Sequence, residues 1–374
     1  MKNLLVTLVF AALTISAVAQ ENLKTDQEFP ILAWVGVPEV ETGVERFKEL
    51  KESGININYS GYSSIEAVEK ALDAARKAGV KLLPSCPELK AEPEKTAKRL
   101  MKHPALAGYH LQDEPGVGNF PELSEWVKRI QAVDKNHYCY INLLPNHAPK
   151  EALGFNSYRE HLEAFVKQVP VSFISFDHYP IDGSGSLNPH YYYANLEEVS
   201  AVAEQRGIPF WAFALATAHN HYPVPTVGEI KVQMFSNLAY GAQTLQYFTY
   251  WNPGVNPYWD FHQAPIDFSG KRTVVYDRIK AVNREIHALA GVFLGAKKVS
   301  VWHTGKRMEG TMLMDKLPEH IHLLETGDNG AVVSLLEKGN NRFLVIVNRD
   351  YRNPMRLTVM TDEHVRRVLK DATT

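Results

Sequence analysis

The chain of 374 residues has only two cysteines, Cys86 and Cys139. Two cysteines are too few for a disulfide scaffold or a zinc cluster, so we expect two free thiols, although an oxidising compartment would permit one bridge between them. Neither sign of charge is in excess, because 40 basic residues face 42 acidic ones for a net charge of −2. This balance excludes a surface that attracts nucleic acid or a membrane through charge.

Long apolar runs are missing beyond the first 20 residues. Lys2–Gln20, "KNLLVTLVFAALTISAVAQ", has a basic start, an apolar run and a small-x-small site at Ala17-Val18-Ala19. This pattern predicts a signal peptide over residues 1–19 and a secreted or periplasmic mature chain. No cysteine follows the predicted cut directly, and no later segment supplies the roughly 20 apolar residues of a transmembrane anchor. We therefore expect neither a lipid anchor nor membrane insertion of the mature chain.

Several motifs of common enzyme classes are also missing. No Gly-rich phosphate loop follows the first apolar run, and no G-x-S-x-G elbow of a serine hydrolase occurs. Four histidines near the candidate site lack the spacing of known zinc motifs: His178, His219, His221 and His262. We expect no metal and no cofactor.

The chain does contain a regular alternation of short apolar runs and amphipathic helical stretches. Eight runs predict strands: 31–37, 55–59, 80–84, 107–112, 138–143, 172–177, 209–215 and 244–250. The spacing of the units is that of βα repeats, so eight in a row predict a (β/α)8 TIM barrel, an α/β fold, over residues 20–295. A doubly wound sheet is the main competitor, and the missing phosphate loop disfavours it.

Helix boundaries carry their own signals. Thr42 with Glu45, and Ser63 with Glu66, match capping boxes, and Gly79 fits the end of the second helix. The last long helix is predicted over residues 274–294.

Beyond residue 295 the pattern changes to short strands separated by turns such as "TGDNG" and "KGNN". Residues 296–374 are predicted to form a small all-β, sandwich-like domain. The sequence stops soon after the strand-like "VRRVLK", so we expect this domain to be incomplete.

The segment "GYHLQDEPG", residues 108–116, ends the fourth predicted strand with two adjacent acids, Asp113 and Glu114. A helix cap is the structural explanation for such acids. The following helix, however, already has Asn119 as an N-cap candidate with Pro121 in its first turn. The position of Glu114 is therefore at a strand tip, where barrel enzymes build their active sites.

An Asn-Glu type acid pair followed by proline, at the end of barrel strand four, resembles the acid/base motif of the large (β/α)8 clan of glycoside hydrolases. The trailing β-domain and the predicted export resemble its β-galactosidase-like bacterial members. The resemblance implies that Glu114 is the general acid, with a pKa raised by burial. Asp113 stands where the clan has Asn, and its like charge would raise that pKa further.

The sequence departs from the clan at strand seven. Retaining members carry a nucleophilic Glu there, but no carboxylate occurs between Ile208 and Val227. Asp177 is a candidate partner: it could activate a water if it lay about 6.5–9.5 Å from Glu114, accept a sugar hydroxyl, or brace a loop.

Further candidates for substrate binding come from strands four, five, six and eight: Asp113, Asn142, His178, Tyr179, Trp251 and Asp260. Asn142 is expected to bind a hydroxyl, and Tyr179 and Trp251 to provide aromatic platforms for sugar rings. Asp260 lies in an aromatic-rich loop, where it either contacts substrate or braces the loop.

These observations predict an exported glycoside hydrolase that acts on an oligo- or polysaccharide. The alternative is a catalytically impaired barrel that binds glycans. The sugar, the linkage, retention or inversion, and the oligomeric state are left open by the sequence.

Overall fold

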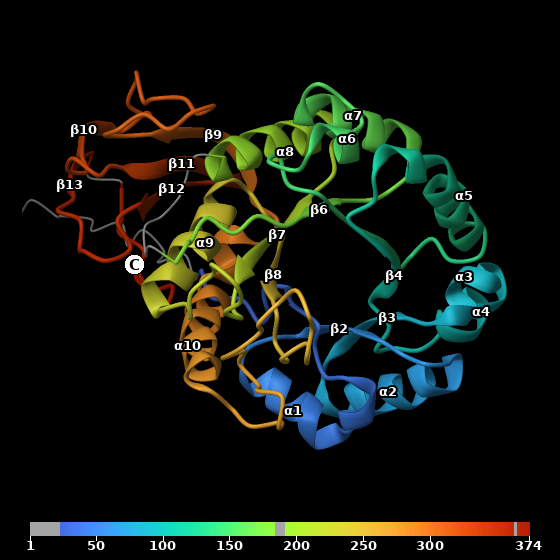
Figure 1. Cartoon of the computed structure of the whole chain (residues 1–374). Helices are drawn as coiled ribbons and strands as arrows, with labels where there is room; N and C mark the ends of the chain where they lie inside the picture. The colour runs from blue at the N-terminus through green and yellow to red at the C-terminus, as the bar shows by residue number, and fades with distance from the viewer. Residues whose placement is uncertain (1–22, 184–190, 363–364) are drawn as a thin grey trace, which may run out of the picture.

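The computed structural model describes residues 23–183, 191–362 and 365–374, so the predicted signal peptide lies outside the described residues. Eight parallel strands form one sheet in the order β3-β2-β1-β8-β7-β6-β5-β4 (Figure 1). The sheet closes between its two ends where Leu82 on β3 pairs with Leu106 just before β4. Two backbone hydrogen bonds of 2.7 Å, from Leu82 N to Ala105 O and from Ala107 N to Leu82 O, make this closure. The predicted (β/α)8 barrel is confirmed.

All eight predicted strands are present, with ends shifted by up to three residues. The barrel strands are β1 Ile31–Trp34, β2 Ile57–Gly61, β3 Lys81–Ser85, β4 Gly108–Asp113, β5 Tyr138–Leu143, β6 Ile174–Phe176, β7 Phe210–Leu215 and β8 Thr244–Phe248. The helices are α1 Val44–Glu52, α2 Ile65–Ala78, α3 Pro87–Ala91, α4 Pro93–Leu100, α5 Phe120–Gln131, α6 Lys150–Leu153, α7 Tyr158–Gln168, α8 Tyr192–Arg206, α9 Val227–Ala239, α10 Val274–Ala288 and α11 Ala290–Phe293. Two short 3-10 helices, η1 Glu39–Glu41 and η2 Val117–Asn119, precede α1 and α5.

The barrel interior is filled by large side chains from alternate positions of the strands. One cluster of buried apolar residues lies inside it: Leu32, Trp34, Ile57, Leu83, Tyr140, Phe173, Trp211 and Phe213. A larger cluster packs the helices onto the outside of the barrel wall. Because aromatic rings occupy the centre, the barrel is a packed core whose chemistry is restricted to its ends.

Two of the predicted helix starts are wrong. The first helix, α1, has Gly43 at its N-cap and no side-chain cap, so Thr42 and Glu45 form no capping box. The cap of α2 is Ser64, one residue later than predicted, because the Ser63 hydroxyl donates to Glu39 instead. The predicted helix over 274–294 is two helices, α10 and α11.

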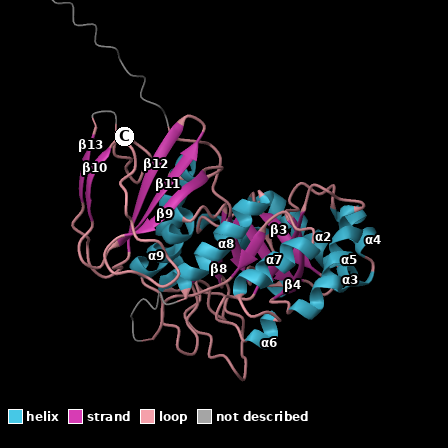
Figure 2. Cartoon of the chain, turned by 90° about the horizontal axis from the view of Figure 1, so that it is seen from above, coloured by secondary structure: helices cyan, strands magenta, loops and turns pink. Residues whose placement is uncertain are grey.

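The C-terminal residues form two small antiparallel sheets beside the barrel (Figure 1). One contains β9 Lys297–His303, β11 Ala331–Lys338 and β12 Asn341–Asn348, and the other pairs β10 Ile321–Glu325 with β13 Thr358–Thr361. Strands β11 and β12 pack on α9, which fixes this unit against the barrel wall (Figure 2). The all-β character is confirmed, whereas residues 365–370 of the strand-like "VRRVLK" form no strand.

Long loops gather at the carboxyl ends of the barrel strands, on the same side as α6 (Figure 2). Within the described part of the chain, no helix has the length and apolarity needed to cross a membrane.

Candidate active site

A bulge in β4 decides which acid faces the barrel interior. His110 pairs with Tyr140 on β5, but Gln112 pairs with Ile141, so β4 holds one extra residue at this point. The extra residue shifts the alternation of side chains, and Asp113 comes level with Asn142. Without the bulge, Gln112 would take the inward position and Asp113 would point into the barrel wall.

Asn142 connects two of the predicted acids. Its Nδ2 group donates to Asp113 Oδ1 at 3.2 Å and to Asp177 Oδ1 at 3.0 Å. The side chain is 2% exposed, and its Oδ1 accepts from the Ser175 hydroxyl at 2.9 Å. Asn142 was predicted to bind a sugar hydroxyl, but both of its amide hydrogens are engaged by carboxyl groups in this structure.

A buried polar network fixes the orientation of the Asn142 side chain. Gln246 on β8 donates from Nε2 to the Ser175 Oγ at 2.9 Å. The Tyr140 hydroxyl, which lies 2.9 Å from the same Oγ, donates to Gln246 Oε1 at 2.6 Å. Because these three strands contribute one network, the amide of Asn142 cannot rotate without breaking buried hydrogen bonds.

Glu114 follows the bulged strand in a left-handed conformation, with φ of 44°. Its backbone N–H donates to Asn142 O at 2.8 Å, which continues the ladder to the mouth of the barrel. Glu114 is exposed to solvent, as Asp113 is, and the strand ends around it bury its carboxyl group in part. This burial raises the pKa of the Glu114 carboxyl, the Asp113 charge raises it further, and a hydrogen bond to Asp177 lowers it in part.

Asp177 follows β6 directly and has the most strongly perturbed carboxyl group of the three. Burial raises the pKa of Asp177 well above its ordinary value, and the charges of Glu114 and Asp113 add to the increase. Asp113 has a raised pKa as well, again mainly through burial. Ionised carboxylates only accept hydrogen bonds, so the contact between Glu114 and Asp177 requires a proton on one of them.

The proximity of Glu114 and Asp177 bears on the distance between their carboxyl groups, which differs between retaining and inverting hydrolases. Retaining pairs of carboxyl groups lie about 5–5.5 Å apart and inverting pairs about 6.5–9.5 Å apart. The Asp177 carboxyl group is near enough to Glu114 to change its pKa through charge and a hydrogen bond, so the protonation of one group depends on that of the other.

The two residues after Asp177 point to opposite sides of the barrel wall. The Tyr179 ring faces the mouth, where it contacts Phe248 at 5.5 Å and Tyr222 at 5.7 Å between ring centroids. His178 is buried against α8, and its Nδ1 group donates to Asn195 Oδ1 at 3.0 Å. Burial lowers the pKa of His178 to about 3, so its ring is neutral. The structure places His178 behind the wall and away from a substrate.

Two other candidates for substrate binding, Trp251 and Asp260, are engaged by protein groups. Trp251 is only 5% exposed, and its ring lies against the Arg46 guanidinium at 5.1 Å. The structure therefore does not support Trp251 as an open platform for a sugar, because its ring faces are covered. Asp260 accepts a short hydrogen bond from the backbone N–H of Asn220, which is the loop-bracing role considered for it.

The helix that follows the acids does not use Asn119 as the sequence predicts. Asn119 occupies the N-cap position of α5 but makes no side-chain cap bond, although Pro121 lies in the first turn as expected. Neither Asp113 nor Glu114 reaches this helix start in any hydrogen bond of the described residues. Their location at the strand tip is therefore unrelated to helix capping.

Tyr59, on β2, lies near Asp113 and is not among the candidate residues of the sequence analysis. Burial raises the pKa of Tyr59 to about 12, and the nearby Asp113 charge contributes to the increase. Its ring packs on Trp34 at 4.4 Å and on His110 at 4.2 Å. Period-two alternation along the strands could have identified these inward rings, but not their contact with an acid.

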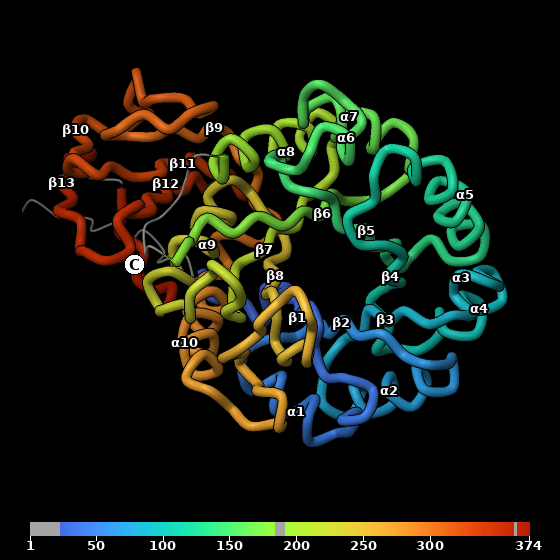
Figure 3. Tube along the Cα trace, viewed as in Figure 1, coloured from blue at the N-terminus to red at the C-terminus, as the bar shows by residue number. Residues whose placement is uncertain are grey.

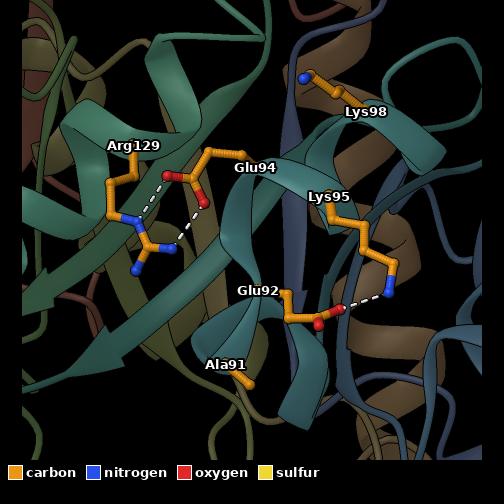
Figure 4. Close-up of a pocket in the computed structure, with 6 residues that line it drawn as sticks. All are labelled: Ala91, Glu92, Glu94, Lys95, Lys98 and Arg129. Atoms are coloured by element: carbon orange, nitrogen blue, oxygen red, sulfur yellow. Dashed lines mark hydrogen bonds and ion pairs between the residues drawn. The ribbon is translucent and has the colours of Figure 1, made fainter.

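Among the described residues, no group of three or more metal-binding side chains is arranged to hold an ion. A surface hollow outside the barrel is lined by residues of α3, α4 and α5 (Figure 4). Its charges pair with each other, since Glu94 bonds Arg129 at 2.7 Å and Glu92 bonds Lys95 at 2.8 Å. This hollow is separate from the carboxyl groups at the barrel mouth.

A closed parallel barrel with three carboxyl groups at the carboxyl ends of its strands has the arrangement in which (β/α)8 enzymes place their active sites. A model of glycoside hydrolase family 42, described as beta-galactosidase, matches residues 142–289. The match begins at Asn142, so it does not include Asp113 or Glu114. No curated protein matches the chain.

Solved structures of beta-galactosidases share the fold. Those from the psychrophilic Marinomonas ef1, the Antarctic haloarchaeon Halorubrum lacusprofundi and Bacillus circulans sp. alkalophilus are each 12% identical, with TM-scores of 0.50, 0.52 and 0.53. The similarity covers 70%, 74% and 74% of this chain and 60%, 60% and 58% of those chains. The chain thus spans about 60% of their length. The predicted resemblance to (β/α)8 glycoside hydrolases is confirmed, and the family match supports a glycoside hydrolase.

Proposed function

We propose that the chain hydrolyses a glycosidic bond, with Glu114 as the general acid. The observation that carries this proposal is the position of Glu114 directly after β4, beside Asp113 and Asp177, which Asn142 joins. Burial and the charge of Asp113 raise the pKa of Glu114 at this place. A protonated carboxyl group at this place can donate to the oxygen of the leaving sugar while positive charge develops on the ring that remains. Beta-galactosides are the first substrates to test, because the family match carries that description.

Asp177 is the proposed second carboxyl group. While Glu114 gives its proton to the leaving group, Asp177 has to be ionised to accept a proton from the attacking water. Because the pKa of Asp177 is raised more strongly, substrate binding has to shift the proton of the pair from Asp177 to Glu114. For this inverting reaction, the substrate has to enter between the two side chains and separate them. Asn142 holds Asp113 and Asp177 in place by donating a hydrogen bond to each.

A glycan-binding barrel without catalysis is the second candidate. It is favoured by the absence of any carboxylate between Ile208 and Val227, the segment that contains β7 and its following loop. Binding alone would need only the aromatic and amide groups of the barrel mouth.

The variant Glu114→Gln tests the acid assignment. Glutamine keeps the size and hydrogen bonding of the side chain but has no transferable proton, so turnover of natural glycosides should fall by about 10²–10⁴-fold. An activated aryl leaving group needs little protonation, and aryl glycosides should therefore lose much less rate. Glu122→Gln, on the exposed first turn of α5, is the matched control.

The two substrate classes separate the candidate functions. Equal losses on aryl and natural substrates, in a folded variant, would remove Glu114 as the acid. Binding of galactosides without any turnover by the parent protein would leave the glycan-binding barrel as the function.

We also propose that the mature protein is exported after cleavage of residues 1–19, on the basis of the N-terminal sequence pattern. Mass spectrometry of secreted or periplasmic material should find an N-terminus near Gln20. Material that retains Met1 would contradict this proposal.

A further inference from the structure

We propose that Trp259 forms an aromatic platform for the distal sugars of an oligosaccharide whose terminal ring lies at the carboxyl groups. This inference rests on the proposed binding of a glycan at Glu114 and Asp177. It concerns a ledge of the barrel mouth, which we define as Tyr179, Phe248, His219, Trp259 and Phe261.

The ledge is a continuous series of ring contacts that leads away from Asp177. Tyr179 contacts Phe248 at 5.5 Å between centroids, and Phe248 contacts His219 at 5.3 Å. His219 contacts Trp259 at 5.4 Å, and Trp259 stacks on Phe261 at 6.1 Å with an interplanar angle of 12°. The series ends in solvent, because Trp259 is 43% exposed.

The ledge is held by hydrogen bonds between the loops after β7 and β8. Asn220 N donates to Asp260, and Asn220 Nδ2 donates to Tyr258 O at 3.2 Å. A backbone hydrogen bond from His262 N to Ala218 O, of 2.9 Å, also joins the two loops. Asn220 has φ of 50°, a left-handed conformation that asparagine tolerates better than most residues. The two loops are therefore clasped, and Trp259 is fixed before any ligand binds.

The orientation of His219 adds to this rigidity. Its Nδ1 group donates to Thr217 O at 2.9 Å, and burial lowers the pKa of the ring, which keeps it neutral. His219 is buried, and the rings of Tyr179, Phe248, Trp259 and Phe261 are partly exposed around it. The Asp260 carboxylate beside Trp259 is engaged by the backbone N–H of Asn220. Pyranose rings have apolar C–H faces that pack on such surfaces, whereas their hydroxyl groups remain in solvent.

The occupant is a glycan because the ledge is continuous with the carboxyl groups at which the proposed reaction occurs. Three ring contacts separate Tyr179, beside Asp177, from Trp259. A ligand that reaches both places must therefore be an oligosaccharide and not a single sugar. The exposure of the Trp259 ring is explained if it contacts the distal sugars of an oligosaccharide.

The experiment measures binding by calorimetry, with Glu114→Gln as the non-hydrolysing background and galactose, β-1,4-galactobiose and β-1,4-galactotetraose as probes. Trp259→Ala should weaken binding of the tetraose by about 5- to 10-fold, since one aromatic stacking contact contributes about 1 kcal/mol. Binding of galactose should change less than about twofold. Trp259→Phe should restore most of the tetraose affinity.

Phe268→Ala is the matched control, because Phe268 belongs to the same loop, is 69% exposed and has no ring contact with the ledge among the described residues. It should leave all three affinities unchanged. Asp260→Ala should weaken tetraose binding by opening the clasp, and Asp260→Asn, which keeps an acceptor oxygen for Asn220 N, should not.

Several results would overturn the platform. Among them are equal losses for galactose and tetraose in Trp259→Ala, no loss for either, and a parent protein that binds none of the probes. A concentration-dependent dimer that Trp259→Ala abolishes would assign the ledge to contact between copies instead. A failure of the proposed hydrolysis has a different signature, namely length-dependent binding through Trp259 without turnover by the parent protein.

Discussion

Removing the amide of Asn142 should destabilise the protein in a strongly pH-dependent way. In Asn142→Ala, the donors to Asp113 and Asp177 disappear, and with them a side chain whose hydrogen bonds lower the pKa of both carboxyl groups. Hydrogen bonds to charged groups contribute about 1.5–3 kcal/mol each. Since both come from one side chain, we expect a loss of about 2–4 kcal/mol in the free energy of unfolding at pH 7.

The sign of the pH dependence follows from the direction of the pKa shifts. Both carboxyl groups have folded-state pKa values above their unfolded values, so the folded state binds more protons and its stability falls as pH rises above about 4. Loss of the Asn142 donors raises these folded pKa values further. The difference between variant and parent should therefore be about 1–2 kcal/mol below pH 4, where only buried packing is lost, and grow towards pH 8.

Thermal unfolding from pH 3.5 to 8 measures this difference, and at neutral pH a midpoint about 5 °C lower than that of the parent is expected. Asn237→Ala is the matched control, because Asn237 is equally buried but bonds neutral groups, the Tyr192 hydroxyl and Phe213 O. Its loss should not vary with pH. If both variants showed the same pH-independent loss, Asn142 would not be anchoring charged groups and the reasoning would fail.

Three further changes test other parts of the structure. Asp177→Asn should increase the free energy of unfolding at pH 7 by about 1 kcal/mol and change it little below pH 4, because it removes a buried carboxyl group whose pKa is raised. Destabilisation at pH 7 in thermal unfolding would refute this. Cys86 and Cys139 are free thiols with pKa values raised to about 11 and about 12 by burial, so iodoacetamide at pH 8 should label them only after unfolding, and rapid native labelling would contradict their placement. Ser157→Ala should cost about 1 kcal/mol by removing the capping box of α7, and a loss within error in denaturant unfolding would show that the cap is not formed.

Much of the fold could be predicted because it depends on local periodicity. Each apolar run is followed by a helix with its own turn or stop signal, and each such unit lies within a short stretch of sequence. Gly79 and Gly207 end α2 and α8 in left-handed conformations, as a helix stop requires. The predicted helix starts at Thr42 and Ser63 are each wrong by one residue. The Thr42 hydroxyl donates to Pro38 O and the Ser63 hydroxyl donates to Glu39, so neither caps a helix.

The candidate site was predictable only as a set of strand-end residues. The sequence places Asp113, Glu114, Asn142 and Asp177 at carboxyl ends of strands, and the barrel topology brings such ends together. It could not show that Arg46 covers Trp251 or that Asp260 bonds Asn220, because each contact joins residues that are far apart in the chain.

The sequence by itself determined the eight repeating units, the small β-domain and the acids at the end of β4. Only the tertiary structure decided that a bulge turns Asp113 inward and that Asn142 holds it together with Asp177, from positions 29 and 35 residues away in the chain. Strand formation follows from neighbouring residues, whereas strand register follows from closure of the whole barrel. The protonation of the carboxyl groups depends on that register, since it sets how closely they approach and how much water surrounds them.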